Sequence, residues 1–165
     1  MNKAMRVAHG DWLLFLGADD ELLVRVDQIA RSLVDADAIY YGNIEIRDNG
    51  RIFGGKFSRY RLMQHNICHQ SIFYPRSIYS HKHYDLTVGL LADYKYNIEL
   101  MGAGAPFVHL PMTISLFNDR GASSGNQPYF EEIKLTTIRK WFGATYYFVK
   151  RLRSAVVRVI KGNSR

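Results

Sequence analysis

Cysteine, long apolar runs and acidic residues near the C-terminus are scarce in this sequence. The one cysteine, Cys68, excludes an internal disulfide and favours a reducing compartment. No stretch approaches the roughly 20 consecutive apolar residues of a membrane-spanning helix, and no internal repeat is present. At 165 residues and 47% hydrophobic content, the chain is long enough for one ordinary domain with a sizeable core.

The N-terminal residues imitate a secretory signal, because Lys3 and Arg6 precede the apolar run 12–18. Asp11 directly abuts this run, however, and the acidic triplet 19–21 stands where a small-residue cleavage site belongs. We therefore expect a cytoplasmic protein.

Basic residues are concentrated at the C-terminal end of the chain. Residues 1–133 contain 13 basic and 15 acidic residues, whereas residues 134–165 contain nine basic residues and no acid. The net charge of +7 therefore belongs to the C-terminal segment, and the remainder is slightly acidic. We expect no nucleic-acid partner, although basic residues interleaved with Trp and Tyr keep that alternative open for the C-terminal segment.

Apolar periodicity and turn residues predict an α/β chain. The expected helices cover residues 2–9, 21–34, 58–65, 90–101 and about 131 almost to the end. The expected strands cover residues 12–16, 38–47, 51–57, 69–79 with a turn or helix at Pro75, and 107–117. The continuous apolar run at 12–16 is typical of a strand covered on both faces, "DNG" at 48–50 indicates a hairpin, and Pro111 indicates an edge strand or a bulge.

The last predicted helix has two chemically different faces. Drawn as one continuous helix at 100° per residue, its apolar residues fall on one arc and its basic residues on the other side. The arc contains Ile138, Trp141, Phe142, Phe148, Val149, Leu152, Ala155, Val156, Val159 and Ile160. Such a helix can lie on an anionic bilayer, which would place the protein peripherally on the inner face of the plasma membrane. Packing of the same arc on the domain is the alternative.

Two adjacent carboxylates, Asp19 and Asp20, follow the apolar strand at 12–16. Ligands of doubly wound sheets bind beyond the carboxyl ends of strands. A divalent cation, Mg²⁺ or Mn²⁺, accepts one or two carboxylates there and completes its shell with water and phosphate oxygens. The alternative is structural, because an aspartate before "ELL" is also an ordinary helix N-cap.

The stretch "MNKAMRVAHGDWLLFLGADDEL" (1–22) resembles the middle of a family 2 glycosyltransferase domain, a nucleotide-sugar enzyme of the GT-A fold. By this resemblance, Asp19 matches the metal-binding carboxylate of the DxD motif and Asp20 the acid that often follows it. The first acid of the motif is replaced by Gly17, so the motif is degenerate.

Three further segments resemble the same family in the same order. "NICHQSIFYPRSIY" is similar to the segment that lines the acceptor side, which implies that His69, Gln70 and Arg76 bind substrate. "LLADYKYNIELMGAG" implies that Asp93 is the catalytic general base at the head of a helix, and "FVHLPMTISLFNDRGASS" resembles the closing strand and its loop. The residues themselves leave alternatives open: Asp93 as a helix cap, and His69 and Gln70 as buried polar groups paired with the backbone.

The resemblance implies a partial GT-A (Rossmann-like) mixed sheet flanked by helices over 1–130, followed by a basic amphipathic helix over 131–165. The family's first βαβ units have no counterpart here. We therefore expect an N-terminally truncated domain with an exposed sheet edge and an apolar flank.

The implied function is metal-dependent, inverting transfer of a sugar from a nucleotide-sugar donor to a glycan or lipid-linked acceptor in cell-surface polysaccharide biosynthesis. An inactive fragment is an equally open outcome, as is a non-catalytic remnant acting as a membrane-associating or protein-interaction module. Assembly as a homo-oligomer or with a complementing N-terminal fragment also stays open.

Overall fold

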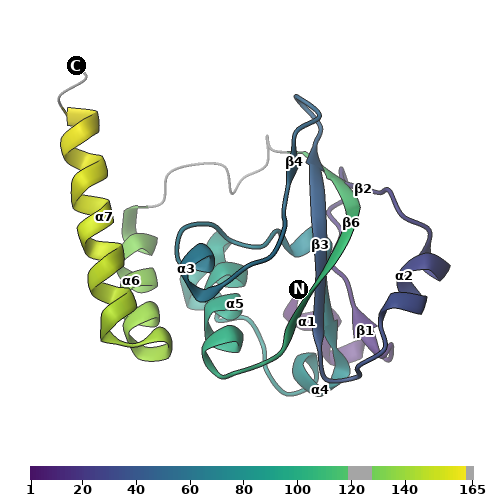
Figure 1. Cartoon of the computed structure of the whole chain (residues 1–165). Helices are drawn as coiled ribbons and strands as arrows, with labels where there is room; N and C mark the ends of the chain where they lie inside the picture. Colours follow the sequence, from purple (N-terminus) through teal and green to yellow (C-terminus); the bar gives the residue numbers. More distant parts are fainter. Residues whose placement is uncertain (119–127, 163–165) are drawn as a thin grey trace.

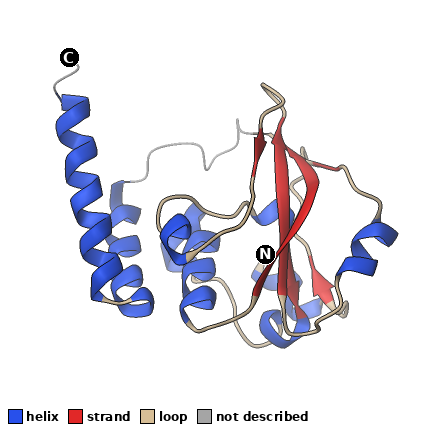
Figure 2. Cartoon of the chain, viewed as in Figure 1, coloured by secondary structure: helices blue, strands red, loops and turns tan. Residues whose placement is uncertain are grey.

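The computed structural model of the chain describes residues 1–118 and 128–162, with side chains for 1–118 and 129–157. The Gly- and Ser-rich loop expected at 119–127 lies outside these residues. The described chain forms a mixed sheet flanked by helices, as the sequence predicts (Figures 1 and 2). The strands are β1 (Trp12–Leu13), β2 (Glu21–Leu22), β3 (Ile39–Ile46), β4 (Ile52–Phe53), β5 (Ile72–Pro75) and β6 (Phe107–Phe117).

The helices agree with the sequence-based expectations at 2–9, 58–65 and 90–101 and after Pro75, and differ from them at 21–34 and at the C-terminal end. The α-helices are α1 (Asn2–Val7), α2 (Val26–Ser32), α3 (Arg59–Leu62), α4 (Arg76–Tyr79), α5 (Ala92–Gly102), α6 (Pro128–Phe142) and α7 (Ala144–Gly162). Two 3₁₀-helices, η1 (His69–Ser71) and η2 (Leu86–Leu91), precede β5 and α5.

The strand order β1-β5-β3-β6-β2, with β4 beside β3, brings several chain segments to one edge of the sheet. β3 and β6 are parallel, β5 is antiparallel to β3, and β1 is antiparallel to β5. β1, β3 and β6 therefore run in the same direction. Their carboxyl ends, together with η1 at the start of β5, lie at the same edge, where ligands bind in open α/β sheets.

Pro111 lies at a bulge of β6, one of the two arrangements that the sequence indicates, and β2 pairs with β6 only at Ser115 and Leu116. β6 lies between β3 and β2, and its pairing with β3 is irregular on both sides of Asn43. Tyr41 pairs with His109, but Asn43 already pairs with Thr113. The extra residues of β6 place the missing N–H of the proline where no ladder bond is needed.

Gly42 sits opposite this bulge, and its missing side chain allows the two strands to approach. A Cβ atom there would lie 2.4 Å from Cγ1 of Ile114 and 2.7 Å from the carbonyl oxygen of Met112. Because one of these atoms belongs to the backbone, a larger residue would force β3 and β6 apart.

Replacing Gly42 by alanine should lower the free energy of unfolding by about 2 kcal/mol, the middle of the range for overpacked sites. Urea unfolding followed by circular dichroism measures this change. Gly104→Ala is the control, because Gly104 has a φ of +88° with nothing within 4 Å, so only the backbone cost of about 1 kcal/mol applies. An equal or smaller loss at Gly42 than at Gly104 would contradict the crowding described here.

The helix expected over 21–34 is wrong in its first third. Glu21 and Leu22 form β2, which pairs with Leu116 and Ser115 of β6, and α2 begins only at Val26. The expectation that an aspartate caps this helix is also wrong, since no side chain caps α2. Pairing with a long neighbouring strand outweighs the local helical spacing of Leu22 and Leu23.

The strand expected over 12–16, covered on both faces, is shorter and only half covered. β1 contains two residues, and Leu16 is exposed. In the part of the chain that the structure describes, β1 pairs with β5 alone, at the end of the sheet. An open apolar hollow of about 390 Å³ lies beside it, lined by Trp12, Leu14, Leu22, Ile29, Leu33 and Phe73 among others. The expected sheet edge and apolar flank are therefore confirmed.

The continuous helix expected from about residue 131 is also wrong, because it breaks at Gly143. This glycine has a φ of +93°, the left-handed conformation that commonly ends helices. α6 lies against α5 and gives Phe130, Ile138 and Phe142 to the main core, whereas α7 runs back along the outer side of α6 (Figure 1). The packing alternative is therefore confirmed for α6. Among the described residues, no helix has both the length and the apolar composition of a membrane span.

Candidate functional site

The candidate site lies at the sheet edge that the carboxyl ends of β1, β3 and β6 share. The turn containing Asp19 and Asp20 follows β1, Arg47 follows β3, and Asn118 follows β6. η1 and the first turn of α5 complete this edge. Five separate chain segments therefore contribute side chains to one region.

Asp93 occupies the first turn of α5 and is held by polar neighbours on both carboxylate oxygens. The side-chain amide of Asn66 donates to Oδ2 at 2.9 Å, and Nδ1 of His69 lies 3.3 Å from the same oxygen. The N–H of Tyr94 donates to Oδ1 at 2.8 Å. The helix cap is the alternative for Asp93, but the N-cap position of α5 belongs to Leu91. Asp93 therefore has a fixed orientation that helix capping does not explain.

A buried hydrogen-bond chain fixes Asn66 in turn. The side-chain amide of Asn97 donates to Oδ1 of Asn66 at 2.9 Å, and the hydroxyl of Tyr74 donates to Oδ1 of Asn97 at 2.8 Å. Asn97 and Tyr74 are completely buried. A fully paired network of this kind holds the carboxylate of Asp93 in one position.

A cavity of about 170 Å³ opens in front of Asp93. It is lined by Asn66, Cys68, His69, Gln70, Leu90, Leu91, Asp93 and Phe117. Only 13% of the Asp93 side chain is exposed, and Gln70 is buried. The structure thus brings three predicted site residues, His69, Gln70 and Asp93, to one cavity.

Asp19 and Asp20 are connected to this cavity through Asn118, the residue that follows β6. Asn118, the neighbour of the cavity residue Phe117, donates from its side-chain amide to Oδ2 of Asp19 at 2.8 Å. Its backbone N–H donates to Oδ1 of Asp20 at 3.1 Å. Asn118 therefore ties the two carboxylates to the end of β6.

Cys68 lines the cavity and is close enough to both Asp93 and Asp20 to be affected by their charges. Burial, together with smaller contributions from the negative charges of Asp93 and Asp20, raises the pKa of its thiol to about 12. Such a thiol is almost entirely protonated near neutral pH and is a poor nucleophile.

Gly17, which replaces the first acid of the expected motif, contacts the carboxylate of Asp20 directly. The N–H of Gly17 donates to Oδ2 of Asp20 at 3.1 Å. A Cβ atom at this position would lie 2.6 Å from the same oxygen. A larger residue would displace the Asp20 carboxylate from its present position between the two backbone amides.

The donor set of this turn fits a hard divalent cation. Asp19 is exposed, whereas Asp20 is half-buried and accepts backbone N–H groups on both oxygens. Among residues 1–118 and 129–157, no group of three or more His, Cys, Asp or Glu side chains could hold a metal ion. Mg²⁺ and Mn²⁺ need only one or two carboxylates when water and phosphate oxygens complete the shell. Of the two carboxylates, Asp19 is the more exposed, whereas Asp20 is held within the turn by bonds to both of its oxygens.

Arg76 lies away from these residues. It begins α4 after the end of β5, whereas His69 and Gln70 precede β5, so the strand separates them. The side chain of Arg76 donates to the carbonyl of Gly10 at 3.3 Å and lines a different hollow. Its predicted part in substrate binding is therefore not supported by proximity to Asp93.

Three residues of the site were not singled out from the sequence. Asn66 and Asn118 hold the acidic groups, and Arg47 donates to Oε1 of Glu21 at 2.7 Å and to the carbonyl oxygen of Asp19 at 3.3 Å. The one signal available for Asn66 and Asn118 was their position beside motif residues. Their partners lie 27 or more positions away in sequence, so spacing alone could not reveal them.

Comparison with known proteins gives relatives over most of the chain. Proteins named "PGL/p-HBAD biosynthesis glycosyltransferase" from Mycobacterium bovis (strain BCG / Pasteur 1173P2) and Mycobacterium tuberculosis (strain ATCC 25177 / H37Ra) are 34% identical over 132 residues. The match covers 75% of this chain and 51% of each relative, so the chain spans about half the length of the curated relatives it matches. No family model matches, and no solved structure matches.

Proposed function

We propose that this homologue of glycosyltransferases works in metal-dependent, inverting sugar transfer of the family 2, GT-A type. The donor would be a nucleotide sugar and the acceptor a glycan or a lipid-linked glycan of the cell surface. The observation that carries the proposal is the arrangement at the sheet edge. An oriented carboxylate, Asp93, faces a cavity, and a pair of aspartates is bound by Asn118, which follows the cavity residue Phe117.

Asp93 is the proposed general base. In inverting transfer, a carboxylate accepts the proton of the acceptor hydroxyl while the hydroxyl oxygen attacks the anomeric carbon and the bond to the diphosphate breaks. Asn66 and His69 hold Asp93 from one side, which leaves further lone pairs on its oxygens for an acceptor hydroxyl in the cavity. Correct positioning of this kind contributes strongly to rate.

The remaining residues bind and orient the substrates. His69 and Gln70 offer hydrogen bonds to sugar hydroxyls from the cavity wall. Asp19, with Asp20 behind it, would hold Mg²⁺ or Mn²⁺ close to the donor diphosphate. A bound cation supplies electrostatic stabilisation of the departing diphosphate. Arg47 adds a positive side chain next to Asp19.

Turnover of nucleotide-sugar donors tests the proposal. The chain is incubated with a panel of labelled donors and Mn²⁺, alone and together with the part of the mycobacterial relative that it does not cover. We expect weak turnover or none from the chain alone, turnover of at least one donor from the mixture, and loss of that turnover on addition of EDTA. Absence of turnover from both would overturn the proposal and favour the non-catalytic module.

A further inference from the structure

α7 packs on α6 through its polar side. Lys150 is only 7% exposed, and its Nζ lies 3.9 Å from Oε2 of Glu131 in α6. Lys134 of α6 forms an ion pair with the same glutamate. Ser154, one turn after Lys150, is half-buried on the same side of α7. Tyr146 of α7 also packs against the main core, with its ring against Phe142 of α6. The inward side of α7 therefore combines one aromatic ring with charged and polar groups.

The opposite side of α7 is apolar and faces outward. Leu152 is two residues from both Lys150 and Ser154, which places it about 200° around the helix from each. Phe148, Val149 and Val156 share its face, because they lie three or four residues away. We call these four residues the apolar strip; Phe148 is 63% exposed and Leu152 is 70% exposed.

This arrangement reverses the usual orientation of an amphipathic helix on a domain, in which the apolar face packs inward. A lysine is buried, with its pKa lowered to about 8 mainly by that burial, while large apolar side chains remain in water. Each apolar side chain would gain roughly 1.5–3 kcal/mol if it were fully covered. The apolar strip is therefore a candidate binding surface for an apolar partner, such as a protein surface or the interior of a lipid bilayer.

The basic residues that border the apolar strip indicate what kind of partner it binds. Arg151 and Arg153 directly flank Leu152 in sequence, so they lie about 100° to either side of it, and both are exposed. Residues 134–165 contain nine basic residues and no acidic one. We propose that α7 docks by its apolar strip on an anionic lipid bilayer, with the helix axis along the surface and Arg151 at the level of the phosphates.

The flanking charges argue against a second copy of this chain as the partner. Two strips packed against each other would bring Arg151 and Arg153 of both copies to one interface with no acidic side chain of α7 to pair with them. Like charges at an interface cost binding energy. Nucleic acid would use the arginines but leave the strip in water, so it accounts for only half of the pattern.

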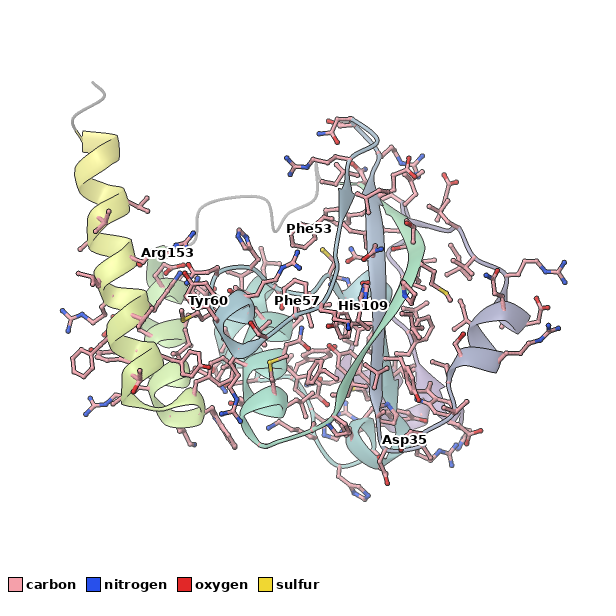
Figure 3. The ribbon with its side chains drawn as sticks, viewed as in Figure 1. Asp35, Phe53, Phe57, Tyr60, His109 and Arg153 are labelled. Carbon is pink, nitrogen blue, oxygen red and sulfur yellow. The ribbon has the colours of Figure 1, made fainter. Side chains whose placement is uncertain are left out.

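α7 is fixed on the domain, so docking would orient the whole molecule. The guanidinium of Arg153 donates to the hydroxyl of Tyr60 in α3 at 3.0 Å (Figure 3). Together with the Glu131–Lys150 contact, this bond joins α7 to two separate elements. This inference does not depend on sugar transfer, and neither does its test.

Vesicle flotation of the whole chain tests the proposal. We expect binding to phosphatidylcholine vesicles containing 30% phosphatidylglycerol, and at least tenfold weaker binding to pure phosphatidylcholine. Leu152→Glu should weaken binding to the anionic vesicles at least tenfold. Leu86→Glu is the matched control, because Leu86 is 73% exposed but lies in η2. Both positions are exposed, so neither variant should change the melting temperature.

A second variant tests the charge component. Arg151→Gln should weaken binding to anionic vesicles about fivefold, as expected for one basic residue near an anionic surface, whereas Arg31→Gln in α2 should not. Equal binding by wild type, Leu152→Glu and Leu86→Glu would overturn the proposal. So would a lipid-free dimer in sedimentation velocity that Leu152→Glu dissociates, or binding to RNA with none to vesicles.

Discussion

Replacing Asp93 by asparagine should reduce sugar transfer by about 10²–10⁴-fold, the contribution typical of a general base. Asparagine has nearly the same shape but is a far weaker base than a carboxylate. The measurement is the initial rate of transfer at saturating donor and Mn²⁺, in the mixture that shows turnover. Raising Mn²⁺ or donor should not restore the rate, because neither replaces the missing base.

Cys68 provides a readout of the same variant that needs no activity. The Asp93 charge contributes to raising the pKa of this thiol, so Asp93→Asn should lower the pKa and increase the thiolate fraction. Alkylation by iodoacetamide at pH 8 should therefore be faster in the variant than in the wild type. Wild-type transfer by Asp93→Asn, with alkylation accelerated, would show that Asp93 lies in the cavity but is not the base.

Replacing Asp19 by asparagine should reduce transfer at limiting Mn²⁺ by about 100-fold, because a neutral amide is a much poorer ligand for a hard cation than a carboxylate. Unlike the loss at Asp93, part of this loss should be recovered at high Mn²⁺. Electron paramagnetic resonance of free Mn²⁺ measures the weakened binding directly.

Asp37→Asn is the control for Asp19. Asp37 is also an exposed aspartate in a turn, but it lies beside the hollow that contains Arg76. It should bind Mn²⁺ and transfer sugar as the wild type does. Unchanged Mn²⁺ affinity in Asp19→Asn would remove Asp19 from the metal site, whatever the effect on activity.

Much of the fold follows from local sequence patterns. The hairpin at 48–50 forms where "DNG" predicts it, and α5 and β6 cover the residues whose spacing predicts them. Elements that depend on distant partners were missed. β2 exists because Glu21 and Leu22 pair with a strand more than 90 residues away, and no local pattern contains that information.

The C-terminal segment shows the same limit in another way. Its apolar and basic faces are visible in the sequence, but their positions were derived by drawing residues 131–165 as one straight helix. Gly143 breaks it, so Phe142 packs in the core while Phe148 faces water. A single residue with a left-handed backbone thus decides which apolar side chains are covered.

The candidate site was predictable where chemistry is carried by single residues. Asp19, Asp20, His69, Gln70 and Asp93 gather at one edge because they adjoin elements that end or begin there. Arg76 was grouped with His69 because both match the same short motif of the family that the sequence resembles. The strand β5 lies between them, so His69 and Arg76 lie at opposite ends of that strand. This separation cannot be inferred from the sequence unless the strand and its direction in the sheet are known.

Because of its bulge, β6 contains more residues than β3 over the same stretch of the sheet. β3 needs three steps to pass from Tyr41 to Ile44, whereas β6 needs six to pass from His109 to Ser115. At about 3.3 Å per residue, the three surplus residues take up roughly 10 Å of chain. Deleting one of them would draw Asn118 back by about 3 Å and turn it to the other face of the sheet. The two aspartates would then lose their tether, so the number of residues between His109 and Ser115 matters to the site even though none of them lines it.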